Sequence, residues 1–156
     1  MEFEGPRPLE ASEIRAAAQL WYDGWYEAHL DIVPASLTAL RTLDSFHDRL
    51  AGARAQVSVM GPVGAPVALC QVNRDELKQL FVAPEARAHG VAAKMIADAE
   101  ARLDRGLVWL ACSVGNDRAA RFYEKHGWRN RGVVEIQVDT SEGPYDLGVW
   151  RFDKLL

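Results

Sequence analysis

In the first third of the chain, hydrophobic positions recur with the period of an α-helix. From Ser12 to Ala28, hydrophobic side chains recur every three or four residues, which predicts an amphipathic helix with Ser12 as its N-cap. Pro34 ends this helix because proline disfavours the helical conformation in the residue before it. Two short helices are then expected, over Pro34–Leu40 and Leu43–Leu50.

Extended patterns occupy the middle of the chain. Hydrophobic runs bounded by glycine, proline and asparagine predict an antiparallel meander of strands over Arg54–Met60, Val67–Val72 and Glu76–Val82. An alanine-rich helix is expected over Gly90–Leu103, with its hydrophobic positions on one face. The following strand, Gly106–Val114, has few polar residues, so both its faces are expected to be buried.

A last helix and two strands complete the pattern. Asn116 suits the N-cap of this helix, and Gly127 suits the left-handed position after its end. The strands Arg131–Val138 and Asp146–Leu155 are expected to pair. Because a strand–helix–strand crossover joins parallel strands, the two strands around the alanine-rich helix should be parallel. We therefore expect one α+β domain over residues 1–156, with a mixed, mostly antiparallel sheet of about six to seven strands and about four helices.

Composition and charge narrow the class of protein. The chain has 156 residues, 49% of them hydrophobic, which is typical of one globular domain. Its net charge of −4 argues against a nucleic-acid partner, because such binding requires Lys and Arg to neutralise phosphates. No hydrophobic run is long enough for a membrane span, and the acidic N-terminus is unlike a signal peptide, so a cytoplasmic protein is expected. Cys70 and Cys112 lie in apolar runs and are expected to be reduced core residues, and no Cys/His spacing resembles a metal site.

The segment PEARAHGVAAKMI, which is Pro84–Ile96, joins a strand to a helix through an arginine, a histidine and a glycine. Free N–H groups at a helix N-terminus attract an anion, and Gly90 with its small neighbours Ala88 and Ala92 permits a close approach to the backbone. Arg87 adds a guanidinium for phosphate oxygens. Taken alone, an ordinary turn with a surface arginine explains these residues equally well. The segment is neither a Walker A loop nor a Rossmann fingerprint, because the GK[ST] ending and the second glycine are absent.

A second segment, SVGNDRAARFYEKHGWR, lies one strand later. Asn116, Ala119, Ala120 and Tyr123 share one helical face. Phe122 is adjacent to Tyr123, so one ring can pack in the core while the other faces a cleft. Taken alone, the segment is more typical of core aromatics at the end of an amphipathic helix.

The two segments together are more specific than either one. Arg87-x-x-Gly90-x-Ala92, followed one strand later by N…A-x-x-F-Y-x-x-x-G-W, resembles the GNAT superfamily of acyl-CoA-dependent N-acetyltransferases. The resemblance runs from about Glu76 to Trp128 and extends loosely over the chain through the order of its elements. It implies a GNAT-like fold whose central parallel strands splay apart, and it implies acetyl-CoA as cosubstrate without a metal.

The resemblance also implies a cofactor site. The backbone of the loop from Arg87 to Ala92 would hold the pyrophosphate of coenzyme A, and the strand Leu80–Val82 would pair with the pantetheine arm. Many family members carry glycine where this chain has Ala88, so Ala88 is expected to keep a negative φ. The complete set of implied cofactor contacts is Leu80, Phe81, Val82, Arg87, Ala88, His89, Gly90, Val91, Ala92, Asn116, Ala119 and Phe122.

Two catalytic roles follow from the same resemblance. Tyr123 falls on the family's usual general acid, which protonates the leaving thiolate. A primary amine with a pKa near ~10.4 must lose its proton before it attacks a thioester. Glu76 stands where some members carry the general base, although a solvated carboxylate at a strand end is an equally good interpretation, and many relatives use a chain of waters. Backbone N–H groups near Phe81 and Val82 are the natural donors to the oxyanion.

In the family, the first helices and the last hairpin usually shape the acceptor pocket. The segment LWYDGWYEAHLDIVP interleaves aromatic and acidic residues, which suits an ammonium-bearing acceptor. Tyr22, Tyr26 and His29 lie on one side of the first helix and are expected to line the cleft as substrate-binding residues. Trp21 and Trp25 are expected to form the core stripe of that helix. A small molecule or a peptide with a primary amine is the expected partner.

These residues predict an enzyme that transfers an acetyl group from acetyl-CoA to a primary amine by direct attack. A covalent route is disfavoured because no cysteine is positioned beside a histidine base. The alternative is a non-catalytic acyl-CoA-binding regulatory module, against which Tyr123 and Glu76 argue because binding requires neither. A nucleotide-binding domain without thioester chemistry is a third reading. A homodimer is compatible with the resemblance, which does not identify the acceptor.

Overall fold

A seven-stranded sheet organises residues 2–156, which are the residues that this computed structural model describes. The strands stand in the order β1-β2-β3-β4-β5-β7-β6, and β4 and β5 form the parallel pair among otherwise antiparallel neighbours. The expected mixed sheet with a central parallel pair is confirmed. The strands are β1 (Arg7–Pro8), β2 (Val57–Met60), β3 (Ala68–Asn73), β4 (Glu76–Val82), β5 (Leu107–Ser113), β6 (Arg129–Thr140) and β7 (Gly143–Leu155).

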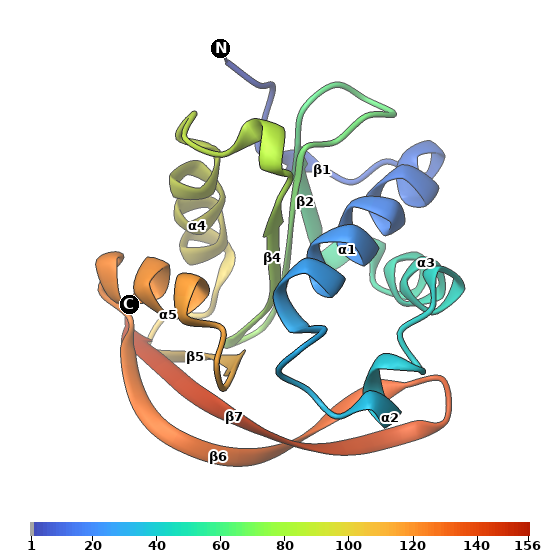
Figure 1. Cartoon of the computed structure of the whole chain (residues 1–156). Helices are drawn as coiled ribbons and strands as arrows, with labels where there is room; N and C mark the ends of the chain where they lie inside the picture. The colour runs from blue at the N-terminus through green and yellow to red at the C-terminus, as the bar shows by residue number, and fades with distance from the viewer. Residues whose placement is uncertain (1) are drawn as a thin grey trace.

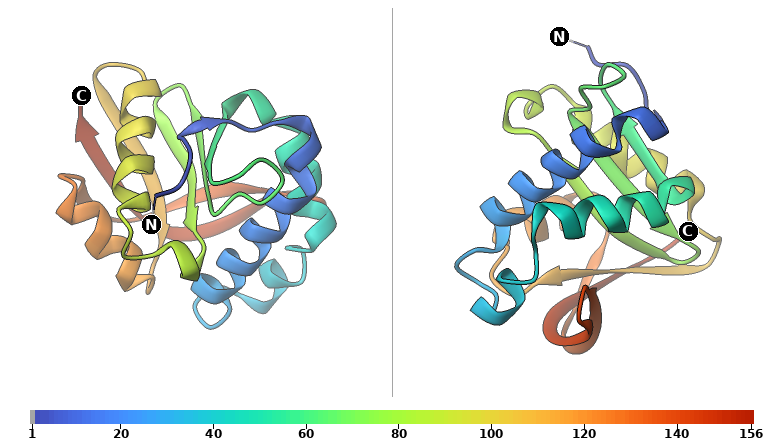
Figure 2. Two further views of the ribbon diagram at one scale, coloured as in Figure 1. Left: turned by 90° about the horizontal axis from the view of Figure 1, so that it is seen from above. Right: turned by 90° about the vertical axis from the view of Figure 1, so that its right-hand side faces the viewer.

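Helices cover both faces of the sheet, as Figures 1 and 2 show. The α-helices are α1 (Ile14–His29), α2 (Ala35–Thr38), α3 (Leu43–Gly52), α4 (Val91–Arg102) and α5 (Asp117–Lys125). Helices α1 and α3 pack on one face of the strands β2 to β4, and α4 packs on the other. The long β6–β7 hairpin passes below α2 and α5 in Figure 1. No helix within residues 2–156 is both long and apolar enough to span a membrane.

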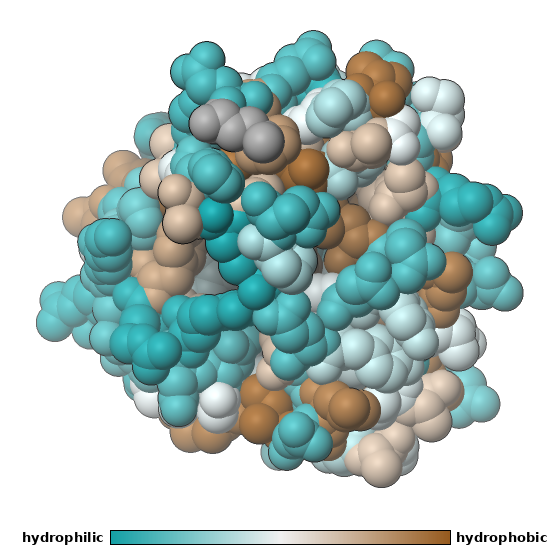
Figure 3. Space-filling view, turned by 45° about the horizontal axis from the view of Figure 1, so that its top comes forward, coloured by the Kyte–Doolittle hydropathy of each residue, from teal (hydrophilic) through white to brown (hydrophobic). Residues whose placement is uncertain are grey.

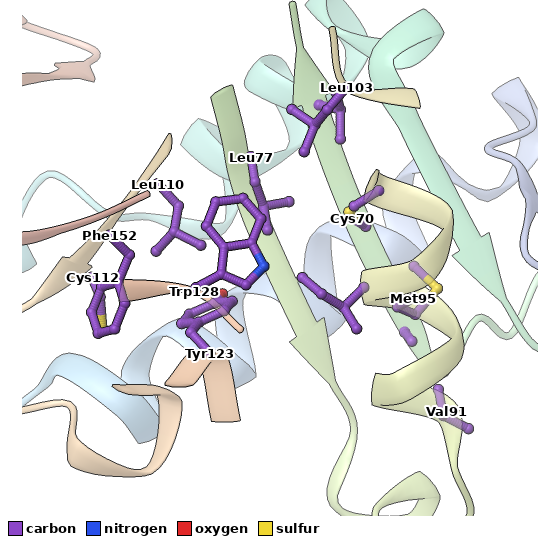
Figure 4. Close-up of a cluster of buried hydrophobic side chains, with 14 of the residues drawn as sticks. Cys70, Leu77, Val91, Met95, Leu103, Leu110, Cys112, Tyr123, Trp128 and Phe152 are labelled. Atoms are coloured by element: carbon purple, nitrogen blue, oxygen red, sulfur yellow. The ribbon is translucent and has the colours of Figure 1, made fainter. Parts of the chain in front are cut away.

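Each face of the sheet has its own hydrophobic core. Successive residues of β3 point to opposite faces, so Leu69 packs with α1 and α3 while Cys70 packs with α4. Figure 4 shows the second core, where α4 lays Met95 against β3. Trp128 and Phe152, which are 1% and 0% exposed, fill the other end of this core beside α5. The two cores fix the helices on either side of the central strands.

Strands β4 and β5 meet at only one end. Glu76 pairs with Trp109, and the Trp109 N–H donates to the carbonyl of Asp75 at 2.9 Å. Beyond this pair the two strands diverge, as Figure 1 shows. The edge of β4 that faces β5 therefore keeps backbone groups available for an extended ligand. Burial alternates along β5, so the expectation that both its faces are buried is wrong: one face borders the opening between the strands.

A β-bulge interrupts β4 near its start. One extra residue, Lys78, stands in β4 opposite the step from Gln71 to Val72. Leu77 and Leu80 consequently face the same core, although strict alternation would place them on opposite faces. The bulge thus changes the face of the sheet to which the side chains after Lys78 point, compared with strict alternation from Glu76.

Three local predictions differ from the structure. Ser12 does not cap α1 but lies in a 3₁₀ turn at Ala11–Glu13, where the Glu13 carboxylate accepts the N–H of Glu10 at 2.9 Å. The first strand of the meander begins at Val57, because a 3₁₀ turn occupies Arg54–Gln56. Pairing between β6 and β7 continues to Thr140 and Gly143, so most of residues 139–145, between the two expected strands, is strand as well.

Candidate active site

A cavity of about 220 Å³ lies where β4 and β5 separate. Its walls come from these two strands, from the N-terminal helices, from α5 and from the β6–β7 hairpin. The cavity therefore touches the strands, α5, the N-terminal helices and the hairpin that the sequence associates with cofactor or acceptor, but not the loop Arg87–Ala92 before α4. Its polar and aromatic lining includes Trp25, His29, Arg41, Arg49, Glu76, Lys78, Asn116, Tyr123 and Asp139.

The loop between β4 and α4 turns through two left-handed residues. Gly90 is the N-cap of α4 with φ +75°, and no side chain caps this helix. Because the first N–H groups of a helix lack intrahelical acceptors, the loop presents donors to an anion. A Cβ at Gly90 would have no neighbour within 4 Å, so the position requires the conformation of glycine rather than its small size.

The expectation of a negative φ at Ala88 is wrong. Its φ is +65°, in the left-handed region. For a residue with a Cβ this conformation costs about 1–2 kcal/mol. The strain explains why glycine suits this position in the family. It also shows that the loop backbone is held in shape by its surroundings rather than by local preference.

A carboxylate on α1 holds the arginine of this loop. Arg87 donates from Nη1 and Nη2 to the two carboxylate oxygens of Glu27, at 2.8 and 3.1 Å. Arg118, near the start of α5, donates to the same carboxylate at 3.3 Å. The hydrogen bonds from Arg87 are the main reason why the pKa of Glu27 is lowered. Glu27 therefore ties α1 to two cations that a phosphate would also attract. Figure 3 shows the molecule with the top of Figure 1 turned forward, and hydrophilic side chains cover much of this face.

Tyr123 brings a protonated phenol to the cavity. It extends from α5, is 9% exposed and lines the cavity. None of the side-chain hydrogen bonds within residues 2–156 uses its hydroxyl. Burial raises the pKa of Tyr123 far above its ordinary value, and the buried sulfurs of Cys112 and Cys70 add to the shift. The phenol thus keeps its proton at neutral pH and has one to donate.

Glu76 lies at the narrow end of the cavity, where β4 and β5 still pair. The residue is partly buried rather than fully solvated. Burial raises the pKa of its carboxyl above the ordinary value, and Lys78 partly offsets this effect. A carboxylate with a raised pKa is a stronger base, so this environment suits proton abstraction.

Cys112 also lines the cavity, from β5. Burial raises the pKa of its thiol to about 12. At neutral pH the sulfur is therefore a thiol, and the thiolate is the nucleophilic form. This environment argues against an acetyl-cysteine intermediate.

Four of the implied cofactor residues line the main cavity, whereas His89, Val91 and Ala92 lie outside it with the rest of the loop before α4. Leu80, Phe81, Asn116 and Ala119 line the main cavity. The Asn116 side chain also accepts the N–H of Ala119, as expected for an N-cap.

Two other implied contacts lie elsewhere. Val82 borders a second hollow of about 670 Å³, between α1 and the end of β4. Phe122 packs on His126 and on Tyr123 instead of lining the main cavity.

On the acceptor side, one of three predictions matches the cavity. His29 lines it, whereas Tyr22 and Tyr26 do not. The hydroxyl of Tyr26 donates to the carbonyls of Thr38 and Arg41, at 3.1 and 2.8 Å, which ties α1 to the segment before α3. The sequence pattern placed these tyrosines on the wrong side of α1.

Trp25 lines the cavity together with His29, which stacks on its ring at 4.8 Å. Burial lowers the pKa of His29 and keeps the imidazole neutral. The acidic side chains of α1 and of the turn after it are not part of the cavity lining: Asp23 and Asp31 are exposed, and Glu27 binds Arg87. The expected acidic wall is therefore absent from the cavity that residues 2–156 form.

Sequence reasoning missed two arginines of the cavity, Arg41 and Arg49. A signal existed for Arg49, because it follows Phe46 by three residues and so lies near the hydrophobic face of α3. Arg41 lies between two short helices and gives no such signal. Within residues 2–156, no group of three or more Cys, His, Asp and Glu side chains is placed to hold a metal.

Comparisons with known proteins agree with this geometry. Residues 53–130, half of the chain, match a family model described as an acetyltransferase (GNAT) domain. A comparison with curated proteins gives no match.

Solved structures of similar fold cover nearly the whole chain. A GCN5-related N-acetyltransferase from Rhodopseudomonas palustris is 20% identical with a TM-score of 0.70, covering 100% of this chain and 99% of its own. Apo YjaB from Escherichia coli is 19% identical with a TM-score of 0.73, covering 98% and 97%. Naa50 from Arabidopsis thaliana, in complex with the bisubstrate analogue CoA-Ac-MVNAL, is 10% identical with a TM-score of 0.59, covering 96% and 97%. The chain belongs to the GNAT superfamily of acetyltransferases, because the family model matches half of it, and the splayed strands and the loop before α4 agree with this assignment.

Proposed function

We propose that this acetyltransferase transfers an acetyl group from acetyl-CoA to a primary amine by direct attack on the thioester. One observation carries the proposal: the hydroxyl-bearing Tyr123 and the carboxyl-bearing Glu76 line the same cavity at the opening between β4 and β5. The raised pKa of each group suits its role, since Tyr123 retains a proton and Glu76 is a stronger base. A purely regulatory binding module would need neither group.

The structure offers suitable groups for coenzyme A. The uncapped start of α4, with the left-handed residues Ala88 and Gly90, would receive the pyrophosphate on backbone N–H groups. Arg87 would add its guanidinium after exchanging Glu27 for phosphate. The free edge of β4 would pair with the amides of the pantetheine arm, and Asn116 borders the cavity opposite. The fold shared with Naa50, which binds a CoA-containing analogue, supports this placement.

The reaction then follows from the positions of the two titratable groups. Glu76 accepts a proton from the ammonium, directly or through water, and the neutral amine nitrogen attacks the thioester carbonyl. Backbone N–H groups of β4 beyond the Lys78 bulge are the proposed donors to the oxyanion. When the carbon–sulfur bond breaks, the hydroxyl of Tyr123 gives its proton to the thiolate, and the resulting tyrosinate takes back the extra proton that the amine nitrogen must lose to become an amide. The products are the N-acetylated amine and the free thiol of coenzyme A.

A thiol-release assay tests the proposal. Acetyl-CoA is incubated with the protein and a panel of primary amines, and mass spectrometry identifies the acetylated product. The expected result is thiol release that depends on the amine and equals the amount of product formed. Binding of acetyl-CoA without transfer to any amine would favour the regulatory module instead.

A further inference from the structure

Arg41 and Arg49 form a cationic corner of the active-site cavity that the proposed reaction does not use. Arg41 follows α2 and Arg49 lies on α3, and both line the cavity together with Glu76. They influence each other electrostatically, since the charge of Arg41 adds to burial in lowering the pKa of Arg49 to about 10. Both guanidinium groups therefore stay charged at neutral pH.

The positive charges in this corner lack a carboxylate within ion-pair distance. Arg41 is 3% exposed, and its Nε has no hydrogen-bond partner within residues 2–156. Its Nη1 donates to the backbone carbonyl of Asp139 at 2.6 Å, a neutral acceptor. The Arg49 guanidinium lies 4.5 Å from the ring centre of Trp21, which is also uncharged. The ion pairs of residues 2–156 include neither arginine.

The acidic groups around the cavity balance the two arginines only in part: the Asp139 charge raises the pKa of both arginines, but burial lowers it by more. The Asp139 carboxylate is exposed and faces Lys78, whose nitrogen lies 4.0 Å away. Glu76 lies on β4, and neither arginine figures among the charges that shift its pKa. A buried guanidinium without a counter-charge is costly, so such groups in native proteins are normally paired. The missing partner is therefore expected to come from a ligand.

We infer that the acceptor is a small primary amine that also carries an oxyanion, a carboxylate or a phosphate ester, bound by Arg41 and Arg49. Guanidinium groups match both oxyanions because their N–H donors form two parallel hydrogen bonds. The inference rests on the proposed acetyltransferase function, to which it adds the class of acceptor. It replaces the cationic acceptor that the aromatic and acidic residues of α1 suggest in the sequence.

The size and shape of the cavity agree with this acceptor. About 220 Å³ lies below the ~300 Å³ at which ordinary ligand pockets begin, so the acceptor end admits a small molecule. Apolar side chains also line the cavity, among them Val33, Leu37 and Val138. The acceptor would place its anion at the arginines and its amine toward Glu76, with a short aliphatic part between them.

Matched pairs of amines test the inference, because the members of each pair differ in the anion. The pairs are L-leucine against L-leucinamide, 4-aminobutyrate against butylamine, and O-phosphoethanolamine against ethanolamine. We expect the anionic member of at least one pair to have a kcat/KM about 10- to 100-fold higher, as for a hydrogen bond to a charged group. The first two pairs report on a carboxylate and the third on a phosphate ester.

Arg49 provides the variant, because Arg41 also fastens the β6–β7 hairpin and its loss could unfold the chain. Arg49→Met removes the charge and keeps most of the side-chain bulk. We expect it to reduce the ratio of kcat/KM within the preferred pair toward one, mainly through KM, and Arg49→Lys to restore part of the ratio. Arg15→Met, at an exposed position outside the cavity, is the control and should leave the ratio unchanged.

Each possible outcome decides the question. A preference for the anionic member that Arg49→Met abolishes supports the inference. Equal transfer to both members of every pair contradicts the inference and leaves the proposed function intact, as does a preference that survives Arg49→Met. Absence of transfer to all six amines, in a protein that binds acetyl-CoA, contradicts the proposed function and the inference together.

Discussion

On one side of the cleft, β4, the following loop and α4 offer main-chain groups to the proposed coenzyme. On the other side, α1, α3 and the β6–β7 hairpin offer side chains to the proposed acceptor. The first side depends on backbone conformation, including φ values of +65° at Ala88 and +75° at Gly90. The second depends on Arg41 and Arg49, which come from segments near each other only after folding. Main-chain groups can bind a coenzyme that is always the same. Side chains, which change by substitution, can be adapted to different acceptors.

The largest expected effect concerns Tyr123, which lies where the two sides meet. Tyr123→Phe removes the proton donor and keeps the ring, so we expect kcat to fall about 10²- to 10⁴-fold. The dissociation constant of acetyl-CoA, measured by calorimetry, should stay nearly the same because the backbone binding groups are untouched. Unchanged turnover would show that another group, or water, protonates the thiolate.

Glu76 gives the next largest effect. Glu76→Gln should lower kcat/KM for the amine about 100-fold, since the amine loses its base. In the wild type the carboxyl must be ionised, so activity should fall as the pH drops through its pKa. Because burial raises that pKa, this acidic limb should lie above the ~4.3 of an ordinary glutamate. A pH–rate profile that keeps the same limb in Glu76→Gln would assign it to a different group.

Gly90 tests whether the coenzyme side depends on backbone conformation. Gly90→Ala forces a Cβ into the left-handed region, at a cost of about 1–2 kcal/mol. We expect a lower free energy of unfolding in urea, or a weaker binding of acetyl-CoA if the loop relaxes to another conformation. Ala97→Gly, at an exposed position near the middle of α4, is a control for helix weakening without a change of φ sign. Full stability and full affinity in Gly90→Ala would contradict a role for this conformation.

Glu27 tests the link between the two sides. Its carboxylate holds Arg87 and Arg118, so Glu27→Gln should free both cations for phosphate. The pair is partly exposed, and such ion pairs contribute at most ~1 kcal/mol, so acetyl-CoA should bind up to ~5-fold more tightly. Calorimetry at low and high salt measures this. Weaker binding in Glu27→Gln would mean that the carboxylate orients Arg87 for the coenzyme instead of competing with it.

The smallest effect is expected at Ala88, in the direction opposite to Gly90. Ala88→Gly relieves the left-handed strain but increases the conformational entropy of the unfolded chain. The balance should raise the free energy of unfolding by about 0.5 kcal/mol. Urea denaturation of the two variants side by side compares the signs. A loss of stability in Ala88→Gly would show that alanine adopts the left-handed conformation at this position without strain.

The sequence predicted the secondary structure of the coenzyme side in detail because its signals are local. Strand β4 has the bounds that the hydrophobic run indicated, and Asn116 and Gly127 stand at the ends of α5 as expected, with φ +88° at Gly127. The left-handed φ of Ala88 was missed, since alanine itself prefers the opposite sign and only the packed loop imposes this one. The bulge at Lys78 was missed for the same reason: it depends on pairing with β3.

The acceptor side was predicted less well because its features are tertiary. The periodicity of α1 placed Tyr22 and Tyr26 beside His29, but only His29 reaches the cavity. Tyr26 instead bonds to carbonyls before α3, a contact that no helical wheel of α1 contains. Arg41 and Arg49 become neighbours only when α2 and α3 pack on the hairpin. Charged residues in a sequence are most often solvated, so the pattern gave no reason to bury Arg41, and its one signal for Arg49 was the spacing of three residues from Phe46.

Thermal unfolding with added ligands tests the coenzyme site most directly. A ligand that binds the folded state raises the midpoint temperature as its concentration increases. We predict that acetyl-CoA and CoA raise the midpoint in a concentration-dependent way, whereas ATP at the same concentrations has little effect. Stabilisation by ATP and not by CoA would contradict the account, because it would make the loop before α4 a nucleotide site without thioester chemistry.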